Sequence, residues 1–275
     1  MNLCLITYQF IVLENYKMNI DGKFNINAEA LVNRIFSHDK YGRNDLNKWI
    51  FNNLSLDKGM SVIDIGCGTG KQTIPIAKII GKFGKILSVD ISSEALNILN
   101  KESLRLGLND RITTLCSKID DLDNHIEENT FDRIISSYSL YYSNNCEKII
   151  ETLWSALKPG GVLFFCGPSH KNNSELKKFH YKLKGISVPL ETEASHFMEN
   201  TSHKFVKKFF NKFDILYFIN PLQYVSVDSL HAYWSSYNLY DEKLNKNFIK
   251  EIKKFFENNS IFITTKRVIG IKATK

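Results

Sequence analysis

Residues 62–70 read VIDIGCGTG, and this stretch decides the fold. Its first four residues hold three β-branched apolar side chains around Asp64, a pattern typical of a central parallel strand that is covered on both faces. Three glycines follow at alternate positions, Gly66, Gly68 and Gly70. Glycine adopts positive φ readily and lets the backbone approach a ligand closely. Ligands of open α/β sheets bind beyond the carboxyl ends of the strands, so the stretch predicts a strand followed by a ligand-binding turn.

Strand and helix patterns alternate around this stretch. Short β-branched runs indicate strands at residues 61–65, 85–90, 111–116, 131–136, 161–166, 214–219 and 261–272. Segments with apolar residues at helical spacing lie between the first five runs. The alternation predicts an α/β fold, a doubly wound and mostly parallel seven-stranded sheet, with helical lid insertions in the C-terminal part.

We expect an N-terminal extension over residues 1–25 and a single domain over 26–275. The core sheet is expected within about 57–168, 212–220 and 261–274, and segments that cover the substrate at about 26–54, 185–205 and 222–258. A Lys-rich helix is predicted over 174–184, followed by an irregular stretch to about residue 202. There is no low-complexity linker or internal repeat that would indicate separate domains.

The composition of the 275-residue chain is that of a globular protein, with 43% apolar and 24% charged residues. Its five cysteines are far apart and form no C-x-x-C pair, which favours free thiols in a reducing compartment. The first residues lack the basic start and the small-residue cleavage site of a secretory signal. No apolar run reaches the roughly 18 residues of a membrane span. A cytoplasmic protein without membrane association is expected.

The basic excess is confined to one part of the chain. The net charge is +7, and residues 171–275 carry 18 Lys and Arg against 10 Asp and Glu, whereas residues 1–170 carry 18 against 19. One interpretation is a basic face that attracts an anionic substrate or nucleic acid. The favoured interpretation is a set of solvated Lys-rich helix faces, because no block of Lys and Arg occurs.

The glycine spacing and two acids indicate the ligand. The spacing is G-x-G-x-G rather than the dinucleotide pattern G-x-G-x-x-G, and no Lys-Ser/Thr pair of a P-loop follows. Asp64 beside the turn repels a pyrophosphate but suits a cationic ligand. Asp90 ends the second strand 22 residues after Gly68, where an acid accepts hydrogen bonds from ribose hydroxyls. The set predicts S-adenosylmethionine as cofactor, and the alternative is that both acids merely cap strand ends.

Four motifs carry a resemblance to a known family. They are VIDIGCGTG, SVDIS, FDRIISSYSLYY and LWSALKPGGVLFF, all within about residues 57–167. Over this region the chain resembles the class I S-adenosylmethionine-dependent methyltransferases, and beyond it only in outline. The resemblance implies a Rossmann-like fold and a methyltransferase activity, without telling one substrate from another.

The resemblance also implies roles for single residues. The three glycines border the methionine part of the cofactor, Asp90 binds the ribose, Ile91 packs on the adenine, and Ser136 lies beside the methionine end. Many members have an acid and an alanine near the adenine amino group, where this chain has Lys118 and Ile119 followed by two aspartates. The predicted cofactor-binding set is Asp64, Gly66, Cys67, Gly68, Gly70, Asp90, Ile91, Lys118, Ile119 and Ser136.

Methyl transfer from a sulfonium is an in-line displacement, so the protein mainly positions the acceptor and excludes water. A base is needed only where the acceptor atom is protonated at neutral pH. The catalytic candidates are Tyr141 and Tyr142, by hydrogen bonding or cation–π contact, and His170 as a general base. Alternatively, these are half-buried loop tyrosines and an exposed loop histidine. No metal motif is present.

Further residues are candidates for the substrate side of the site. They are Tyr41, Arg43, Tyr138, Tyr233 and Trp234. Tyr233 and Trp234 belong to a helical stripe with Leu230 and Tyr237, which forms either a lid over the acceptor or plain core.

The function expected is methyl transfer to an oxygen, nitrogen or carbon atom of a small-molecule metabolite. An RNA or protein methyltransferase that uses the basic C-terminal third is the alternative, although the tetrapeptide of amino-directed DNA enzymes and a Pro-Cys nucleophile are absent after Ser136. A binding protein without turnover is a third possibility, and the glycine spacing disfavours an NAD-linked oxidoreductase. The oligomeric state and the acceptor are left open.

Overall fold

The computed structural model of the chain describes residues 36–38 and 40–275. The extension predicted at 1–25 and the first part of the segment 26–54 lie outside the described residues. The described chain divides into two compact units. The sheet unit comprises Leu46–His170, Leu190–Phe218 and Arg267–Lys275, and the helical unit comprises residues 36–38, 40–45, Lys171–Pro189 and Ile219–Lys266.

The seven strands form one sheet, which confirms the predicted fold class. Their order is β3 (Ile112–Cys116), β2 (Lys85–Asp90), β1 (Ser61–Ile65), β4 (Phe131–Ser137), β5 (Leu157–Pro168), β7 (Phe262–Thr274) and β6 (Lys212–Tyr224). Strands β1 to β5 pair with one another in parallel, whereas β7 pairs with β5 in antiparallel register, with Val162 opposite Thr274. The reversal of strand order between β1 and β4 opens a ligand-binding edge next to the glycine turn.

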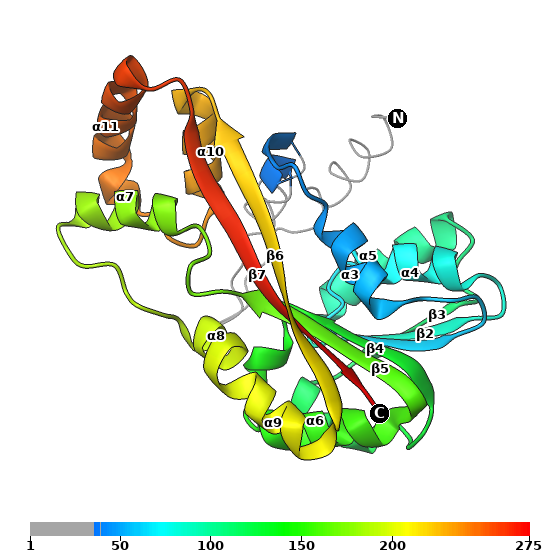
Figure 1. Ribbon diagram of the computed structural model, residues 1–275. Coiled ribbons are helices and arrows are strands. Elements are labelled where there is room, and N and C mark those ends of the chain that lie inside the picture. The colour runs from blue at the N-terminus through cyan, green and yellow to red at the C-terminus, as the bar shows by residue number, and fades with distance from the viewer. Residues whose placement is uncertain (1–35, 39) are drawn as a thin grey trace. The chain divides into compact units, whose positions relative to one another are not determined.

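Helices of the sheet unit cover both faces of the parallel strands (Figure 1). On one face α3 (Leu46–Leu54), α4 (Thr73–Ile80) and α5 (Ser93–Arg105) pack on Val62, Ile86 and Ile135. On the other, α6 (Cys146–Ala156) and α9 (Ser202–Phe209) pack with Ile63 and Ile134. Neighbouring residues of a strand point to opposite faces, so β1 supplies both layers and is buried along its length.

Two strands are longer than predicted. Strand β5 begins at Leu157 and runs through the Lys-Pro-Gly-Gly stretch that was expected to precede it. A register irregularity between Phe131 and Arg133 of β4 accommodates these residues, as a β-bulge does. Strand β6 continues to Tyr224, and its Pro221 is tolerated because β6 is an edge strand.

The irregular stretch predicted to reach about residue 202 is wrong from Glu193 onward. It contains α8 (Glu193–His196) and a π-helical turn, η3 (Phe197–Thr201), that leads directly into α9. A capping box between Thr192 and Ser195 starts α8. The π turn inserts a residue into the helical ladder, so no single 3.6-residue repeat marks this segment.

The helical unit has its own core. It contains α7 (Ser174–Lys184), α10 (Val227–Ser236), the short 3₁₀ turn η4 (Glu242–Leu244) and α11 (Asn245–Asn258). Leu230, Tyr233 and Trp234 are fully buried here, and the indole ring of Trp234 stacks on Phe248 with 3.9 Å between centroids. The stripe predicted as lid or core therefore packs as core within this unit. Among the described residues, no helix has both the length and the apolar character that crossing a bilayer requires.

Candidate functional site

The glycine turn after β1 adopts the backbone that the sequence predicts. Gly66, Gly68 and Gly70 have φ of +71°, +54° and +88°. The N–H groups of Gly66 and Cys67 donate to the carbonyl oxygen of Val89 at 2.8 and 3.0 Å, which ties the turn to the end of β2. A Cβ atom added to Gly68 would meet nothing within 4 Å. The turn is therefore held in place by hydrogen bonds to β2, and the backbone at Gly68 has free space for a ligand beside it.

Asp90 joins the end of β2 to this turn. One carboxylate oxygen accepts the Gly68 N–H at 2.8 Å, and the other accepts the Ser92 N–H at 2.9 Å. A carboxylate has about four acceptor positions, so both oxygens retain capacity for further donors such as ribose hydroxyls. The acid and the open glycine predicted to share one ligand are thus in direct contact.

Asp64 lies beneath the turn, where it is 1% exposed. Its carboxylate accepts a hydrogen bond from Thr73 Oγ1 at 2.7 Å, and Ser88 Oγ donates to Thr73 Oγ1 at 3.2 Å. Burial, with a smaller contribution from the charge of Asp90, raises the pKa of Asp64 to about 7. A cation bound above the turn would favour the ionised form, and the role of Asp64 toward such a ligand stays a prediction.

Cys67 is an apolar part of the same turn. It is 4% exposed, and burial together with the charges of Asp64 and Asp90 raises the pKa of its thiol far above the ordinary range. A neutral buried thiol is not a nucleophile.

The ends of β1 and β4 are joined by a serine that the sequence analysis missed. Ser139 Oγ donates to the carbonyl oxygen of Ile65 at 2.6 Å and lies 2.6 Å from Ser136 Oγ, so the buried Ser136 hydroxyl donates to it. A Cβ atom on Gly66 would come within 2.4 Å of Ser139 Oγ. The sequence signal that could have revealed Ser139 is the serine-rich stretch SSYS at the end of the fourth strand, since a small polar side chain there can approach Gly66 of the glycine turn.

The residues predicted near the adenine follow β2 and β3. Ile91 is 48% exposed directly after Asp90, and Ile119 is partly buried against the core. Contact of either side chain with an adenine stays a prediction. Lys118 occupies the N-cap position of the 3₁₀ turn η1 (Ile119–Asn124) without a capping hydrogen bond from its side chain. Asp120, the first of the two aspartates that follow Ile119, accepts hydrogen bonds from Ser143 Oγ at 2.5 Å and from the backbone of Asn144 at 3.0 Å.

These hydrogen bonds determine the direction in which the pKa of Asp120 is shifted. Partial burial raises the pKa of its carboxyl, but the hydrogen bonds from Ser143 and Asn144 outweigh burial and leave that pKa below its ordinary value. Asp120 therefore holds η1 to the loop that precedes α6.

The three tyrosines after β4 differ in their surroundings. Tyr138 has a φ of +61°, a costly conformation outside glycine, and its N–H donates to the carbonyl of Cys166 at 2.8 Å. Tyr141 packs beside Gly167, where an added Cβ would lie 2.9 Å from its ring, and burial raises the pKa of its hydroxyl. Tyr142 is 46% exposed, with its ring 4.7 Å from that of Tyr141. Tyr141 is thus a buried, uncharged side chain, and the ring of Tyr142 is exposed to solvent.

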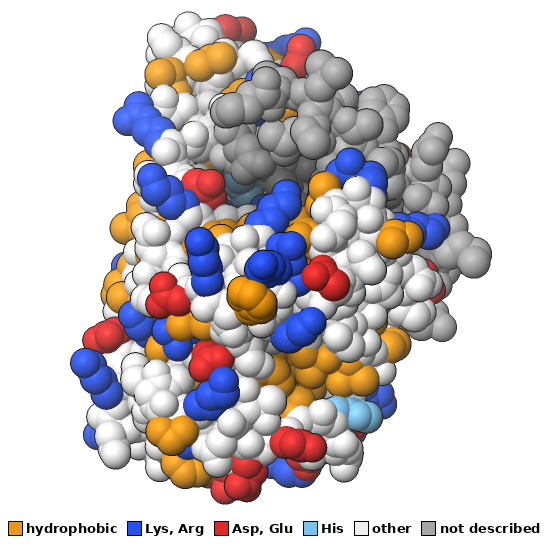
Figure 2. All heavy atoms as spheres, turned by 90° about the vertical axis from the view of Figure 1, so that its right-hand side faces the viewer, with side chains coloured by type: hydrophobic (Ala, Val, Ile, Leu, Met, Phe, Trp, Pro, Cys, Tyr) orange, Lys and Arg blue, Asp and Glu red, His pale blue; other side chains and the backbone are white. Residues whose placement is uncertain are grey.

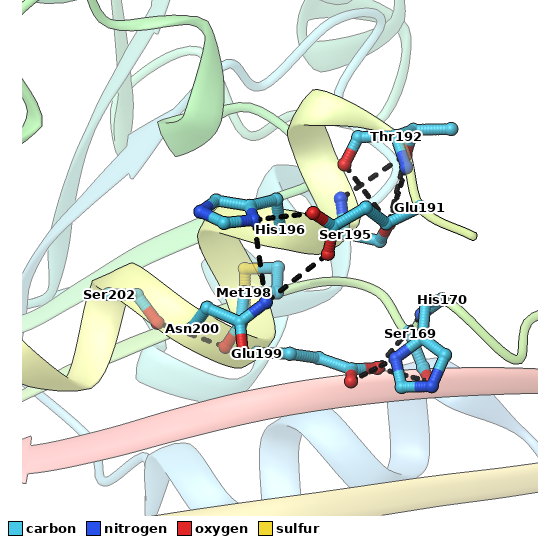
Figure 3. A network of polar contacts seen from close by, with 10 residues as sticks. All are labelled: Ser169, His170, Glu191, Thr192, Ser195, His196, Met198, Glu199, Asn200 and Ser202. Carbon is cyan, nitrogen blue, oxygen red and sulfur yellow. Dashed lines mark hydrogen bonds and ion pairs between the residues drawn. The ribbon is translucent and has the colours of Figure 1, made fainter. Parts of the chain in front are cut away.

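His170, just beyond β5, is paired with a carboxylate. Its Nδ1 lies against the carboxylate of Glu199 in η3, and its backbone N–H donates to the same carboxylate at 2.8 Å (Figure 3). Ser169 Oγ also donates to Glu199, at 2.6 Å. Glu199 was absent from the predicted site, because its segment was expected to be irregular and lies 29 residues from His170.

The remaining substrate-side candidates belong to the helical unit. The ring of Tyr41 lies 4.8 Å from that of Tyr224, and the backbone N–H of Arg43 donates to Asn220 at 2.8 Å. Tyr233 accepts a hydrogen bond from Asn173 at 2.8 Å. Trp234 is wholly buried, as described above, so packing is the role that the structure shows for it. Contact of these side chains with a substrate stays a prediction.

Within the part of the chain that the structure describes, no group of three or more His, Cys, Asp or Glu side chains is arranged to hold a metal ion.

The region of the chain that holds the glycine turn and Asp90 is similar to known proteins. The sequence profile of a family described as "Methyltransferase domain" matches residues 56–188. The ubiquinone/menaquinone biosynthesis C-methyltransferase UbiE of Haemophilus ducreyi is 29% identical over 126 residues, 45% of this chain and 48% of that protein. Protein-L-isoaspartate O-methyltransferase of Methanococcus vannielii is 34% identical over 110 residues, 40% of this chain and 48% of that protein.

Among solved structures, the YcgJ protein of Bacillus subtilis superposes with a TM-score of 0.55 at 14% identity, over 83% of this chain and 97% of that one. At such identity the likeness concerns the fold alone. The chain spans about half the length of the curated relatives named above. The matched region holds β1 to β5, the glycine turn and Asp90, and residues 56–188 belong to the class I S-adenosylmethionine-dependent methyltransferase family.

Proposed function

We propose that the chain binds S-adenosylmethionine at the carboxyl edge of β1, β2 and β4 and transfers its methyl group to a small-molecule acceptor. The observation that carries the proposal is the hydrogen bond from the Gly68 N–H to the Asp90 carboxylate, because an acid proposed to accept the ribose hydroxyls then lies beside an open backbone. This contact does not specify which atom of the acceptor receives the methyl group, whether oxygen, nitrogen or carbon.

Each group of the site has a task in this proposal. When bound, the cofactor supplies a methyl group activated by the sulfonium charge. Asp90 accepts the ribose hydroxyls, and Gly68 allows the close approach of the backbone. The ionised carboxylate of Asp64 favours the cationic ligand from beneath the turn. The buried Ser136 and the partly buried Ser139 hold the strand ends in register, and Tyr141 helps to exclude water from the methyl end.

Two observations favour a small acceptor over RNA or protein. Basic side chains of the C-terminal third are partly neutralised, as in the pairs Lys184–Asp241 and Lys208–Glu147. On the face drawn in Figure 2, Lys and Arg are interspersed with acidic and apolar side chains. By their names, one of the two relatives described above is a C-methyltransferase of ubiquinone/menaquinone biosynthesis and the other an O-methyltransferase of protein L-isoaspartate, so methylation of RNA or protein remains an outcome of the test. A cytoplasmic location stays a prediction.

Cofactor binding is tested first, by calorimetry with S-adenosylhomocysteine. We expect Asp90→Ala to weaken binding at least tenfold without loss of the folded state, because the ribose hydroxyls and the Gly68 N–H both lose their acceptor. Unchanged affinity would remove Asp90 from the site, and tight binding of NADH in place of S-adenosylhomocysteine would contradict the family assignment of the pocket.

The acceptor class is tested with methyl-labelled S-adenosylmethionine and a cell extract separated into small-molecule, RNA and protein fractions. Label in the small-molecule fraction supports the proposal. Label in RNA or protein would make the basic C-terminal third the substrate surface.

A further inference from the structure

The helical unit contains an open hollow that takes no part in the proposed cofactor site. It has a volume of about 360 Å³ and lies between α7, α11 and the beginning of β7, which all belong to this unit (Figure 1). Ligand pockets of proteins measure about 300–1,000 Å³, so the hollow has room for a small molecule. None of its lining residues belongs to the cofactor, catalytic or substrate-side residues predicted from the sequence.

The apolar lining of the hollow consists of aromatic rings from three elements and one aliphatic side chain. Phe179 of α7 and Phe255 of α11 each lie edge-on to Phe262 of β7, with ring centroids 6.1 and 5.3 Å apart. Such contacts fix the rings against one another. Ile263 also lines the hollow and is 45% exposed. A hydrocarbon group bound here would remove this apolar surface from water, which is favourable.

Two lysines of α7 line the same hollow. Lys178 and Lys182 are four residues apart, so their side chains are neighbours on one face of the helix, where like charges are destabilising. Both residues are exposed, and neither ammonium forms an ion pair or hydrogen bond within the part of the chain that the structure describes. Lys184 of the same helix, in contrast, pairs with Asp241 at 3.5 Å. An anion bound between Lys178 and Lys182 would relieve their repulsion.

The acid that lines the hollow is already engaged by the protein. The carboxylate of Glu175 accepts a hydrogen bond from the Thr265 N–H of β7 at 3.0 Å. The described residues of the helical unit include 13 Lys and Arg against 7 Asp and Glu, a net charge of +6. The charge around the hollow therefore favours an anionic group beside the two lysines.

We propose that this hollow binds a small amphipathic carboxylate, a hydrocarbon chain of medium length with one carboxylate end. Lys178 and Lys182 hold the carboxylate by charge-assisted hydrogen bonds, and the chain lies on the three phenylalanine rings. The rest of the lining offers no further polar partner apart from the engaged Glu175, so polar groups along the chain would be desolvated without compensation. The site includes no residue of the glycine turn, and the inference does not rest on the proposed function.

The carboxylate contact is tested by calorimetric titration of the full-length chain with decanoate, below its micellar concentration, and with decan-1-ol as the uncharged analogue. We expect one saturable site for decanoate. Lys178→Gln combined with Lys182→Gln should weaken decanoate binding at least tenfold and leave the response to decan-1-ol unchanged. Lys184→Gln removes the same charge from the same helix outside the hollow and should bind decanoate like the wild type. Absence of saturable binding, or equal affinity in the wild type and the double variant, would overturn the inference.

The chain contact is tested with a carboxylate introduced into the apolar lining. Ile263→Asp should weaken decanoate binding at least tenfold, because the new charge repels the ligand and replaces apolar surface. Ile219→Asp is the matched control, since Ile219 is a 54% exposed isoleucine of the same unit outside the lining. Both substitutions are at exposed positions, and circular dichroism checks that the variants fold. Equal affinities in the two variants would show that the chain does not lie in the hollow.

Lysines beside exposed apolar side chains also occur where proteins bind anionic membranes. Sedimentation with phosphatidylglycerol vesicles distinguishes this case, and we expect the wild type and the double lysine variant to remain equally in the supernatant. Sedimentation of the wild type that the double variant loses, without binding of free decanoate, would assign the lysines to a bilayer surface and overturn the inference. Affinity for S-adenosylhomocysteine should be the same in all these variants, so a failure here leaves the proposed function standing.

Discussion

At the scale of single residues, glycine substitutions distinguish the cost of a positive φ from the loss of a ligand contact. Gly68 and Gly107 both have positive φ, +54° and +65°, and a Cβ atom at either would meet nothing within 4 Å. Gly68→Ala and Gly107→Ala should therefore lower the free energy of unfolding similarly, by about 1–2 kcal/mol, the usual penalty for a left-handed side chain. Calorimetric titration with S-adenosylhomocysteine should show weaker binding for Gly68→Ala only. Equal affinities in the two variants would mean that the ligand does not approach Gly68.

Asp64 makes the free energy of unfolding depend on pH. Its pKa is raised from 3.8 to about 7 in the folded protein, so the folded state retains a proton that the unfolded state loses over this interval. The stability due to this group is present below pH 3.8 and is lost as pH rises toward 7. Asp64→Asn retains an acceptor for Thr73 without titrating.

The change is measured by urea unfolding at pH 5 and pH 8. The wild type should lose about 2–3 kcal/mol relative to Asp64→Asn between these conditions, because the unfolded carboxyl is already ionised at pH 5 and the folded pKa lies about two units above that pH, each unit corresponding to about 1.4 kcal/mol. The variant should also bind the cationic cofactor more weakly at pH 8. A stability difference that does not vary with pH would show that Asp64 is ionised throughout.

At the scale of elements, Ser139 joins the ends of two strands that are far apart in sequence. Ser139→Ala removes the donor to the Ile65 carbonyl and the acceptor of the buried Ser136 hydroxyl. Buried polar groups left without partners cost about 1–3 kcal/mol, so the free energy of unfolding should fall by this amount. Ser143→Ala, whose hydroxyl bonds the less buried Asp120, should cost less in the same denaturation experiment. A Ser139→Ala variant as stable as wild type would contradict the role of this link.

Elements with strong local patterns could be predicted from the sequence, and those defined by tertiary contacts could not. The run from Val62 to Gly70 contains its own strand signal, turn signal and ligand signal. The helix over Glu193–His196 was missed because one turn and an inserted π-helical residue give no repeat to detect. Glu199 was missed with it. The bulge opposite Phe131 similarly lets β5 pass through a Pro-Gly-Gly sequence that ordinarily stops a strand.

At the scale of the whole molecule, the helical unit contains a buried histidine. His180 is 1% exposed and accepts a hydrogen bond from Trp234 Nε1 at 3.3 Å. Burial and then the Lys184 ammonium lower the pKa of His180, with Asp241 opposing them. The unfolded state therefore binds the proton more readily, and the stability contributed by the neutral ring is lost as pH falls through and below about 6.5.

The helical unit should accordingly lose structure first on acidification. Trp234 fluorescence, recorded in a Trp49→Phe and Trp154→Phe background, should shift to longer wavelength between pH 6.5 and 5, whereas hydrogen exchange in β1 and β4 should change less. His180→Gln retains an acceptor for the indole without a titrating ring and should remove the transition. A shift that persists in this variant would assign it to another group.

The order of strands in the sheet bears on biosynthesis. Strand β7 lies between β5 and β6 but follows both in the chain, and β7 is the sheet neighbour of β6. While a ribosome makes the chain from its N-terminus, β1 to β5 can assemble with an open edge at β5, and β6 emerges before the strand with which it pairs. Exposed strand edges invite pairing with other chains. Newly made molecules therefore pass through an interval in which two edges need protection, and that interval closes only when residues 262–274 have left the ribosome.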